Sequence, residues 1–267
     1  MASLTFTLRE QHRLPLDLGD LQPERLAGES ERALAARPLL LGNRRQALGE
    51  LMAVRMGDPG TVVIEGTGGS CDRLGAGMSR GRLIVDGDAG RFLGLGMSGG
   101  DIEVRGSVGP LAAAEAAGGV VRIAGDAGPR LGGCLPGAGG LSGAAVLVQG
   151  SCAELAGQKM RRGLIVVGGD AGPHLAMGLR GGTVIVRGAC GPDPGPLMAR
   201  GTLWLAREPD RLLPTFVEDG VHDLLWLRLL ERHLAALGLD GVLPSRRVRR
   251  LAGDVAGLGK GEILLAA

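Results

Sequence analysis

The stretch GLIVVGGDAG at residues 163–172 is one copy of a unit that recurs along the middle of this 267-residue chain. Each unit opens with a short run of aliphatic and β-branched residues, and nearly every run ends in glycine, often as GDAG or a variant of it. The units start at Gly60, Gly81, Gly100, Gly119, Ala144, Gly163, Gly182 and Gly201, and the spacing is constant apart from a slightly longer first step and a clearly longer step between Gly119 and Ala144. Self-similarity at a period of about 20 residues is typical of a solenoid.

Apolar residues alternate with mixed ones inside each run. The second and fourth positions are apolar in every unit, from Val62 and Ile64 in the first to Leu203 and Leu205 in the last. Strand side chains alternate between faces, so one face of every unit is buried, and a single short strand cannot bury it alone. Stacking the units in register buries that face. The sequence therefore predicts an all-β fold: a single-stranded right-handed parallel β-helix of about eight coils, with a small N-terminal α/β flank and a C-terminal helix.

A second apolar row supports this stack. The sixteenth residue after each unit start is Met97, Ala116, Leu135, Met160, Leu179 or Met198 in successive units. Methionines at this spacing suit a soft-metal site, but methionine commonly fills gaps in cores, and we interpret the row as core. The long step before Ala144 is one coil plus an insertion near residues 137–142, which predicts a loop at one edge of the stack.

The composition argues against several classes of partner. The net charge is only +2, which gives no electrostatic case for nucleic acid or a membrane surface. Aromatic residues make up 2% of the chain and tyrosine is absent, so base-stacking platforms are not expected. No apolar run approaches the roughly 20 residues that span a bilayer, and the first residues lack the pattern of a secretory signal. We therefore expect a cytoplasmic protein.

Two flanks adjoin the predicted stack, which spans residues 56–206. Residues 1–55 hold a strand-like start at Leu4 to Leu8, a brief helical stretch near Pro23 to Ala27, and the lead-in to the stack. Residues 207–267 contain an amphipathic helix that ends at Gly238. One of its faces carries Leu225, Leu229, Arg232 and Ala236, and the adjacent face carries Trp226, Leu230, His233 and Leu237. We expect this helix to cover the end of the stack or an outer face of it, because an open end exposes unpaired strand edges.

Residues suited to catalysis or metal binding are scarce and scattered. The four histidines have no metal-binding spacing, and the motifs HExxH, GxSxG and SxxK do not occur. The four cysteines form no CxxC pair and are interpreted as structural thiols of a reducing compartment. Asp88, Asp126 and Asp170 share a repeat position and are interpreted as turn formers that hydrogen-bond their own backbone. We expect no catalytic residue and no metal site in this chain, and none of these residues indicates a directly bound cofactor.

Two surface features call for a partner or a ligand. The outward third strand position becomes apolar late in the stack, at Leu147, Val166, Ile185 and Trp204. This row is either an interface with another protein chain or a surface that the C-terminal helix of the same chain covers. The second feature is a cluster of arginines at successive corners, Arg161, Arg162, Arg180 and Arg200. They are either solvated edge charges or a basic ridge for an anionic ligand or an acidic partner.

The repeat resembles a known family of domains. Glycine-rich coils in which glycines flank alternating apolar residues, with methionine or leucine late in each coil, are similar to the C-terminal domain of the large subunit of glutamate synthase. The same domain forms the C subunit of formylmethanofuran dehydrogenase. The lead-in GNRRQALGELMAV at residues 42–54 resembles that of the C subunits, and the long segment before the stack, residues 1–55, also fits them. The resemblance covers roughly residues 40–205.

The resemblance implies a scaffold subunit of a larger enzyme. Archaeal members belong to a tungsten or molybdenum enzyme that fixes CO2 as formylmethanofuran. Bacterial members belong to a formyltransferase/hydrolase complex that moves a formyl group from tetrahydromethanopterin to a methanofuran analogue and hydrolyses it to formate. The chain has two lysines among its 30 basic residues, a composition that favours the bacterial complex.

The expected partners also follow from the resemblance. They are an amidohydrolase-like A subunit, a B subunit and a formyltransferase D subunit, and the metals and the methanofuran analogue are expected in these partners. The polyglutamate tail of that analogue is a candidate ligand for Arg161, Arg162, Arg180 and Arg200.

Three alternatives stay open. The first is the C subunit of a tungsten or molybdenum dehydrogenase. The second is a glutamate synthase-type spacer domain, against which the lead-in at residues 42–54 argues. The third is a hexapeptide-repeat acyltransferase, although only one sharp β run occurs in each unit and His174 is the only histidine within the coils.

Overall fold

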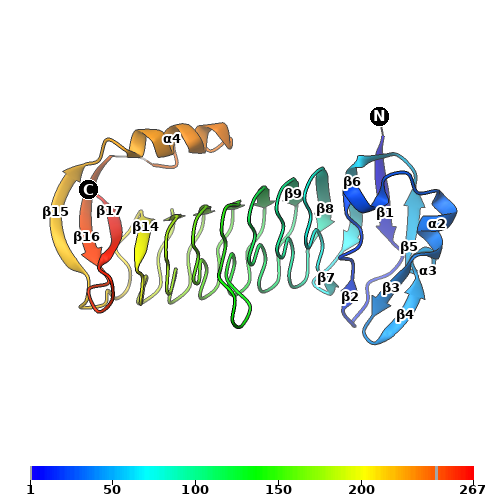
Figure 1. Ribbon diagram of the computed structural model, residues 1–267, viewed down its shortest axis with the longest axis horizontal. Helices are drawn as coiled ribbons and strands as arrows, with labels where there is room; N and C mark the ends of the chain where they lie inside the picture. The colour runs from blue at the N-terminus through cyan, green and yellow to red at the C-terminus, as the bar shows by residue number, and fades with distance from the viewer. Residues whose placement is uncertain (1, 244–245) are drawn as a thin grey trace.

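The computed structural model describes residues 2–243 and 246–267. Within these two ranges the fold is mostly β, with one mostly parallel sheet of 13 strands and a second sheet of four strands. The chain runs as a row of stacked turns, with an N-terminal flank at one end and a group of C-terminal strands at the other (Figure 1). No helix within the described ranges combines the length and the apolar character that crossing a bilayer requires.

The repeat units supply the central strands of the large sheet. These strands are β6 (Asp58–Thr67), β8 (Arg82–Gly87), β9 (Asp101–Val104), β10 (Val120–Ile123), β11 (Ala145–Val148), β12 (Leu164–Val167), β13 (Thr183–Val186) and β14 (Arg200–Leu205). Each is parallel to the next and pairs in register with its equivalent, as Val184 does with Leu203. The predicted strands and their inward-facing aliphatic residues are confirmed, because all of the latter are buried.

The predicted second apolar row is buried, but one of its residues was assigned wrongly. Met97, Met160 and Met198 are fully buried, as expected of core residues. In the unit with the insertion, however, the position belongs to Leu141 and not to Leu135. Leu141 is completely buried, and Ser142 beside it donates its backbone N–H to Ala116 of the preceding unit. Leu135 lies in the inserted loop, because the extra residues precede the core position that Leu141 occupies.

A ladder of aspartate and serine side chains ties neighbouring units together. Asp88 accepts from the backbone N–H of Ser107 at 2.8 Å, and the Ser107 hydroxyl accepts from the N–H of Asp126 at 3.0 Å. The series continues from Asp126 to Ser151 at 2.7 Å and from Ser151 to Asp170 at 3.0 Å. The prediction that these aspartates hydrogen-bond their own turn was wrong. Each caps the equivalent turn one unit further along, because in-register stacking brings that N–H within reach.

The N-terminal flank closes one end of the stack. Strand β1 (Ser3–Leu8) lies parallel to β6, and β5 (Met52–Arg55) pairs antiparallel on its other side. The smaller sheet contains β2 (Leu16–Asp17), β3 (Pro38–Leu41), β4 (Arg44–Ala47) and β7 (Cys71–Asp72). Three short helices complete the flank: α1 (Pro23–Leu26), α2 (Glu31–Ala36) and α3 (Leu48–Leu51). The strand expected at residues 4–8 and the helical stretch near residue 23 are both present.

The C-terminal extension closes the other end with strands that the sequence reasoning missed. It contains β15 (Val217–Asp223), α4 (Leu227–Ala236), β16 (Arg247–Gly253) and β17 (Lys260–Ala266). Strand β17 pairs parallel to β14, and β16 and β15 follow antiparallel. The helix begins at Leu227, so Leu225 and Trp226, which the predicted faces included, precede it. It ends before Gly238, whose φ is +79°.

The ladder gives a prediction about stability. Asp126→Ala removes the acceptor for the N–H of Ser151 and should lower the free energy of unfolding by about 1 kcal/mol, the net value of one such hydrogen bond. Urea titration of the purified chain measures the change. Asp126→Asn keeps a side-chain oxygen at the same place and should lose clearly less. Equal losses in the two variants would contradict a capping role.

Candidate functional site

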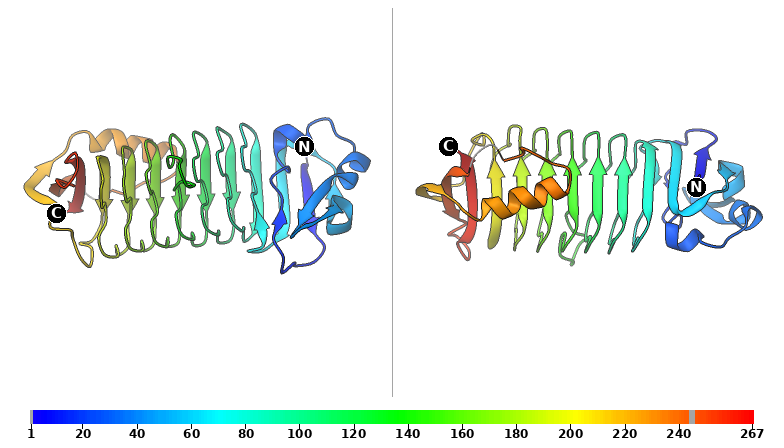
Figure 2. Two further views of the ribbon diagram at one scale, coloured as in Figure 1. Left: turned by 60° about the horizontal axis from the view of Figure 1, so that its bottom comes forward. Right: turned by 90° about the horizontal axis from the view of Figure 1, so that it is seen from above.

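The outer apolar row of the late units is covered by the chain itself. The exposed fractions of Leu147, Val166, Ile185 and Trp204 are 6%, 3%, 0% and 0%. These side chains form one cluster with residues of the C-terminal extension, namely Leu227, Leu234, Val242, Leu243, Val248 and Leu264. Helix α4 lies across the strands of this half of the stack (Figure 2). The prediction of a partner interface at these four residues is therefore corrected in favour of the alternative, coverage by the C-terminal extension.

The side of the helix that faces the sheet also differs from the prediction. Leu227 and Leu234, two turns apart, are the buried residues of α4. Leu225 and Leu229, which the sequence analysis placed together on one face, are 66% and 67% exposed. The helix lies over the later strands, where the outward third position is apolar, and Val120 of β10 packs at the edge of the cluster. Over β9 and β10 the corresponding positions are Glu103 and Arg122, which have no apolar surface to offer it.

This packing can be tested with two leucines of the same helix. Leu234→Ala removes a buried side chain and should lower the free energy of unfolding by about 2 kcal/mol or more. It should also speed protease cleavage between residues 224 and 243, because α4 loses its anchor on the sheet. The matched control is Leu229→Ala on the exposed side, which should change neither quantity measurably. If both variants behave alike, α4 does not pack on the apolar row in solution.

The four predicted arginines line one corner of the stack. Arg161, Arg162, Arg180 and Arg200 are all exposed. The pairing of β12 with β13 aligns Arg161 with Arg180, and Arg200 pairs directly with Lys260 of β17. The row of positive charge thus extends one strand beyond the prediction. Within residues 2–243 and 246–267, none of the four arginines takes part in an ion pair. We call these four arginines and Lys260 the basic ridge.

The inserted loop adjoins the basic ridge. The guanidinium group of Arg161 lies over Gly139, so close that a Cβ there would be 2.6 Å from its Nε. Only glycine fits at this position without displacing the arginine. The loop therefore shapes one end of the ridge.

The thiols of the stack are core residues. Cys71, Cys134, Cys152 and Cys190 are buried and unpaired. Burial raises the pKa of Cys152 and of Cys190 to about 12, so both are protonated thiols at neutral pH and unsuited to nucleophilic attack. In the part of the chain that the structure describes, no three residues of the types His, Cys, Asp and Glu gather as a metal site would require.

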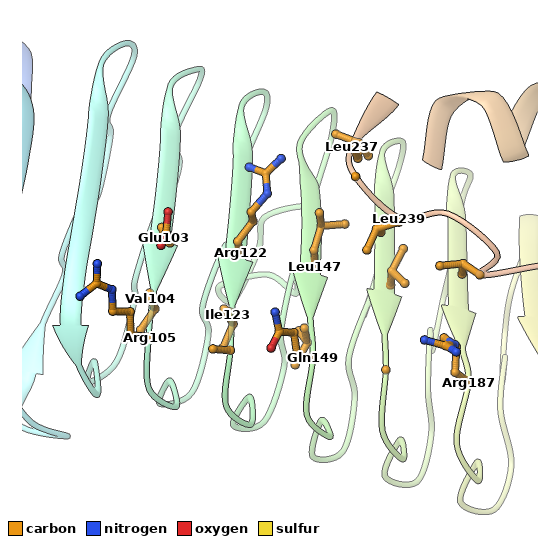
Figure 3. Close-up of a pocket in the computed structure, with 16 residues that line it drawn as sticks. Glu103, Val104, Arg105, Arg122, Ile123, Leu147, Gln149, Arg187, Leu237 and Leu239 are labelled. Carbon is orange, nitrogen blue, oxygen red and sulfur yellow. The ribbon is translucent and has the colours of Figure 1, made fainter. Parts of the chain in front are cut away.

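A groove lies where the C-terminal extension meets the uncovered sheet. It is a cavity of about 520 Å³ with Leu147 and Val166 on the sheet side and Leu237, Leu239 and Val242 on the side of the extension. Polar side chains of the sheet complete it, among them Arg105, Arg122, Gln149 and Arg187 (Figure 3). The sequence analysis missed this groove because its two walls are far apart in the chain and meet only when α4 folds over the sheet.

Comparisons with known proteins agree with this architecture. No family model matches the chain. The C subunit of the formyltransferase/hydrolase complex of Methylorubrum extorquens is 51% identical over 57 residues, which cover 21% of this chain and 22% of that protein. The sequence match thus spans about a fifth of the relative. A chain in the crystal structure of the formyltransferase/hydrolase complex of the same organism, solved with methylofuran, superposes with a TM-score of 0.93 at 40% identity, over 98% of this chain and 99% of that one.

Proposed function

The chain belongs to the family of the C subunit of the formyltransferase/hydrolase complex, and from this we propose that it is the non-catalytic scaffold of such a complex. The complex supports formyl transfer from formyl-tetrahydromethanopterin to a methanofuran analogue, followed by hydrolysis to formate. The observation that carries this proposal is the superposition with a TM-score of 0.93 and 40% identity over nearly the whole of both chains.

The proposed partners are the other subunits of the complex. They are an amidohydrolase-like A subunit, a B subunit and a formyltransferase D subunit, with the metals and the cofactor held mainly by these partners. The related structure is a complex named for four subunits, which supports a hetero-oligomer. We place this assembly in the cytoplasm, where one-carbon metabolism supplies its substrates.

The architecture that we propose suits a scaffold. The stacked turns are assigned as a single-stranded right-handed parallel β-helix over residues 56–206, between a lead-in flank at residues 1–55 and an extension at residues 207–267. The pairing of each parallel strand with the equivalent strand of the next unit supports this assignment. Such a rod is stiff, because each unit is hydrogen-bonded to the units on both sides, and it presents faces of fixed spacing to other subunits.

The basic ridge is proposed to hold the anionic tail of the methanofuran analogue. Arg161, Arg162, Arg180 and Arg200 are exposed, lie at the same or adjacent positions of successive corners, and have no carboxylate partner among the described residues. Guanidinium groups bind carboxylates well, and a row of them fits a chain that carries several. The related complex was crystallised with methylofuran bound.

Purification of the assembled complex tests the scaffold role. A tagged copy of this chain, expressed in its native host, should co-purify with an amidohydrolase-like protein and a formyltransferase, identified by mass spectrometry. The purified complex should transfer the formyl group. Stoichiometric tungsten or molybdenum would favour a dehydrogenase instead, and acyl-CoA transfer by the isolated chain would favour an acyltransferase.

Four substitutions test the basic ridge. Replacing Arg161, Arg162, Arg180 and Arg200 with alanine should lower the affinity of the assembled complex for the methanofuran analogue on the order of tenfold, since each exposed pair contributes below about 1 kcal/mol. Equilibrium dialysis measures the retained cofactor. The matched control replaces four exposed arginines of the N-terminal flank, Arg13, Arg32, Arg44 and Arg45. Full retention by the ridge variant would remove the proposal.

A further inference from the structure

The groove beside the C-terminal extension has an ordered arrangement of side chains. The position that follows the paired residues of each strand runs along it as Arg105, Ala124, Gln149, Gly168 and Arg187. Long polar side chains thus alternate with small ones, and Figure 3 shows Arg105, Gln149 and Arg187 along this row. Neighbouring strands lie about 4.8 Å apart, so Arg105 and Arg187, four strands apart, stand about 19 Å from each other.

The charge of the groove is positive. Its lining contains three arginines and one carboxylate, Glu103. Glu103 is already paired with Arg82 at 2.6 Å, outside the groove. Arg105 forms an ion pair with Asp86 at 3.4 Å and Arg122 one with Asp101 at 3.6 Å, whereas Arg187 takes part in no ion pair within the described residues. Arg187 is therefore free to bind a carboxylate, and Arg105 and Arg122 keep further N–H donors, because one guanidinium group carries five.

The opposite wall is apolar. Leu237, Leu239 and Val242 of the extension face Leu147 and Val166 of the sheet across the groove. A ligand that fills this space needs apolar surface for the middle and negative charge for the ends. The groove exists only while α4 packs on the sheet, because one wall belongs to the extension.

We propose that this groove docks an acidic segment of another subunit of the complex. One apolar side chain of that segment fits between Leu147 and Leu239, and carboxylates on either side of it bind Arg187 and the pair Arg105 and Arg122. An extended peptide rises about 3.3 Å per residue, so about six residues span the roughly 19 Å between the outer arginines. Arginine is one of the residue types enriched among those that contribute most to protein interfaces.

This inference rests on the proposed function only for the existence of other subunits. It concerns a different surface from the basic ridge, which lies at the corner before the strands, whereas Arg105 and Arg187 follow their strands. The apolar wall also favours the acidic segment over the anionic tail proposed for the basic ridge. A purely anionic tail has no apolar group to pack against Leu237, Leu239 and Val242.

Photocrosslinking in the assembled complex tests the proposal. Gln149 is exposed at the centre of the row, so Gln149→p-benzoylphenylalanine leaves the core intact. Irradiation of the purified complex should link this position to an acidic stretch of one of the other subunits, identified by peptide mass spectrometry. Crosslinks only within the chain, or to the methanofuran analogue, would overturn the proposal. A complex that fails to assemble even with the unmodified chain would count against the proposed function instead.

A charge reversal shows whether the arginines direct the docking. Arg187→Glu in the Gln149→p-benzoylphenylalanine background should reduce the yield of the intersubunit crosslink about tenfold, because a like charge replaces an attractive one. The matched control is Arg130→Glu, at an exposed corner outside the groove, which should leave the yield unchanged. Equal yields for both variants would show that the segment does not bind through Arg187.

Discussion

The in-register hydrogen bonding between parallel strands of successive repeat units is the constraint on which the rest of this structure depends. It places equivalent residues directly above one another, so each inner position must be aliphatic and each corner must accept the close approach of the next. Gly119 shows the corner requirement: its φ is +87°, and a Cβ would lie 2.5 Å from the carbonyl oxygen of Gly100. The aspartate and serine ladder is a consequence of the same alignment, because it brings each side chain to the backbone N–H of the following unit.

That constraint fixes the inside of the stack and leaves the outside free to vary. At the third strand position the outward residue is charged over β9 and β10 and apolar over β11 to β14, and this difference decides where α4 can pack. The extension covers the apolar part of the face and stops where Glu103 and Arg122 begin. The edge of the covered area is therefore both apolar and basic, which makes it suited to a protein partner. The basic ridge is a separate product of the same stacking, since it brings arginines at neighbouring positions of successive corners close together.

Much of the fold could be predicted because the same sequence unit repeats at a nearly constant spacing along the chain. The strands and both buried rows follow from positions counted along the chain. The errors arose where an insertion interrupts the repeat or where the chain has no repeat. Leu135 was counted by number, but the inserted loop moved the core position to Leu141. The faces of the helix near residues 225–237 were assigned without knowing its partner, and several leucines around the helix left more than one orientation open.

The sequence by itself determined the family, the repeating strands, the buried aliphatic rows and the arginine cluster. These depend on interactions between positions at a constant separation, so a single unit predicts its neighbours. Only the tertiary structure decided what covers Leu147, Val166, Ile185 and Trp204, where β17 joins the stack, and that a groove lies between Arg105 and Arg187. Those features bring the C-terminal extension against units far away in the chain. No periodicity encodes such contacts, because they depend on how two different surfaces fit together.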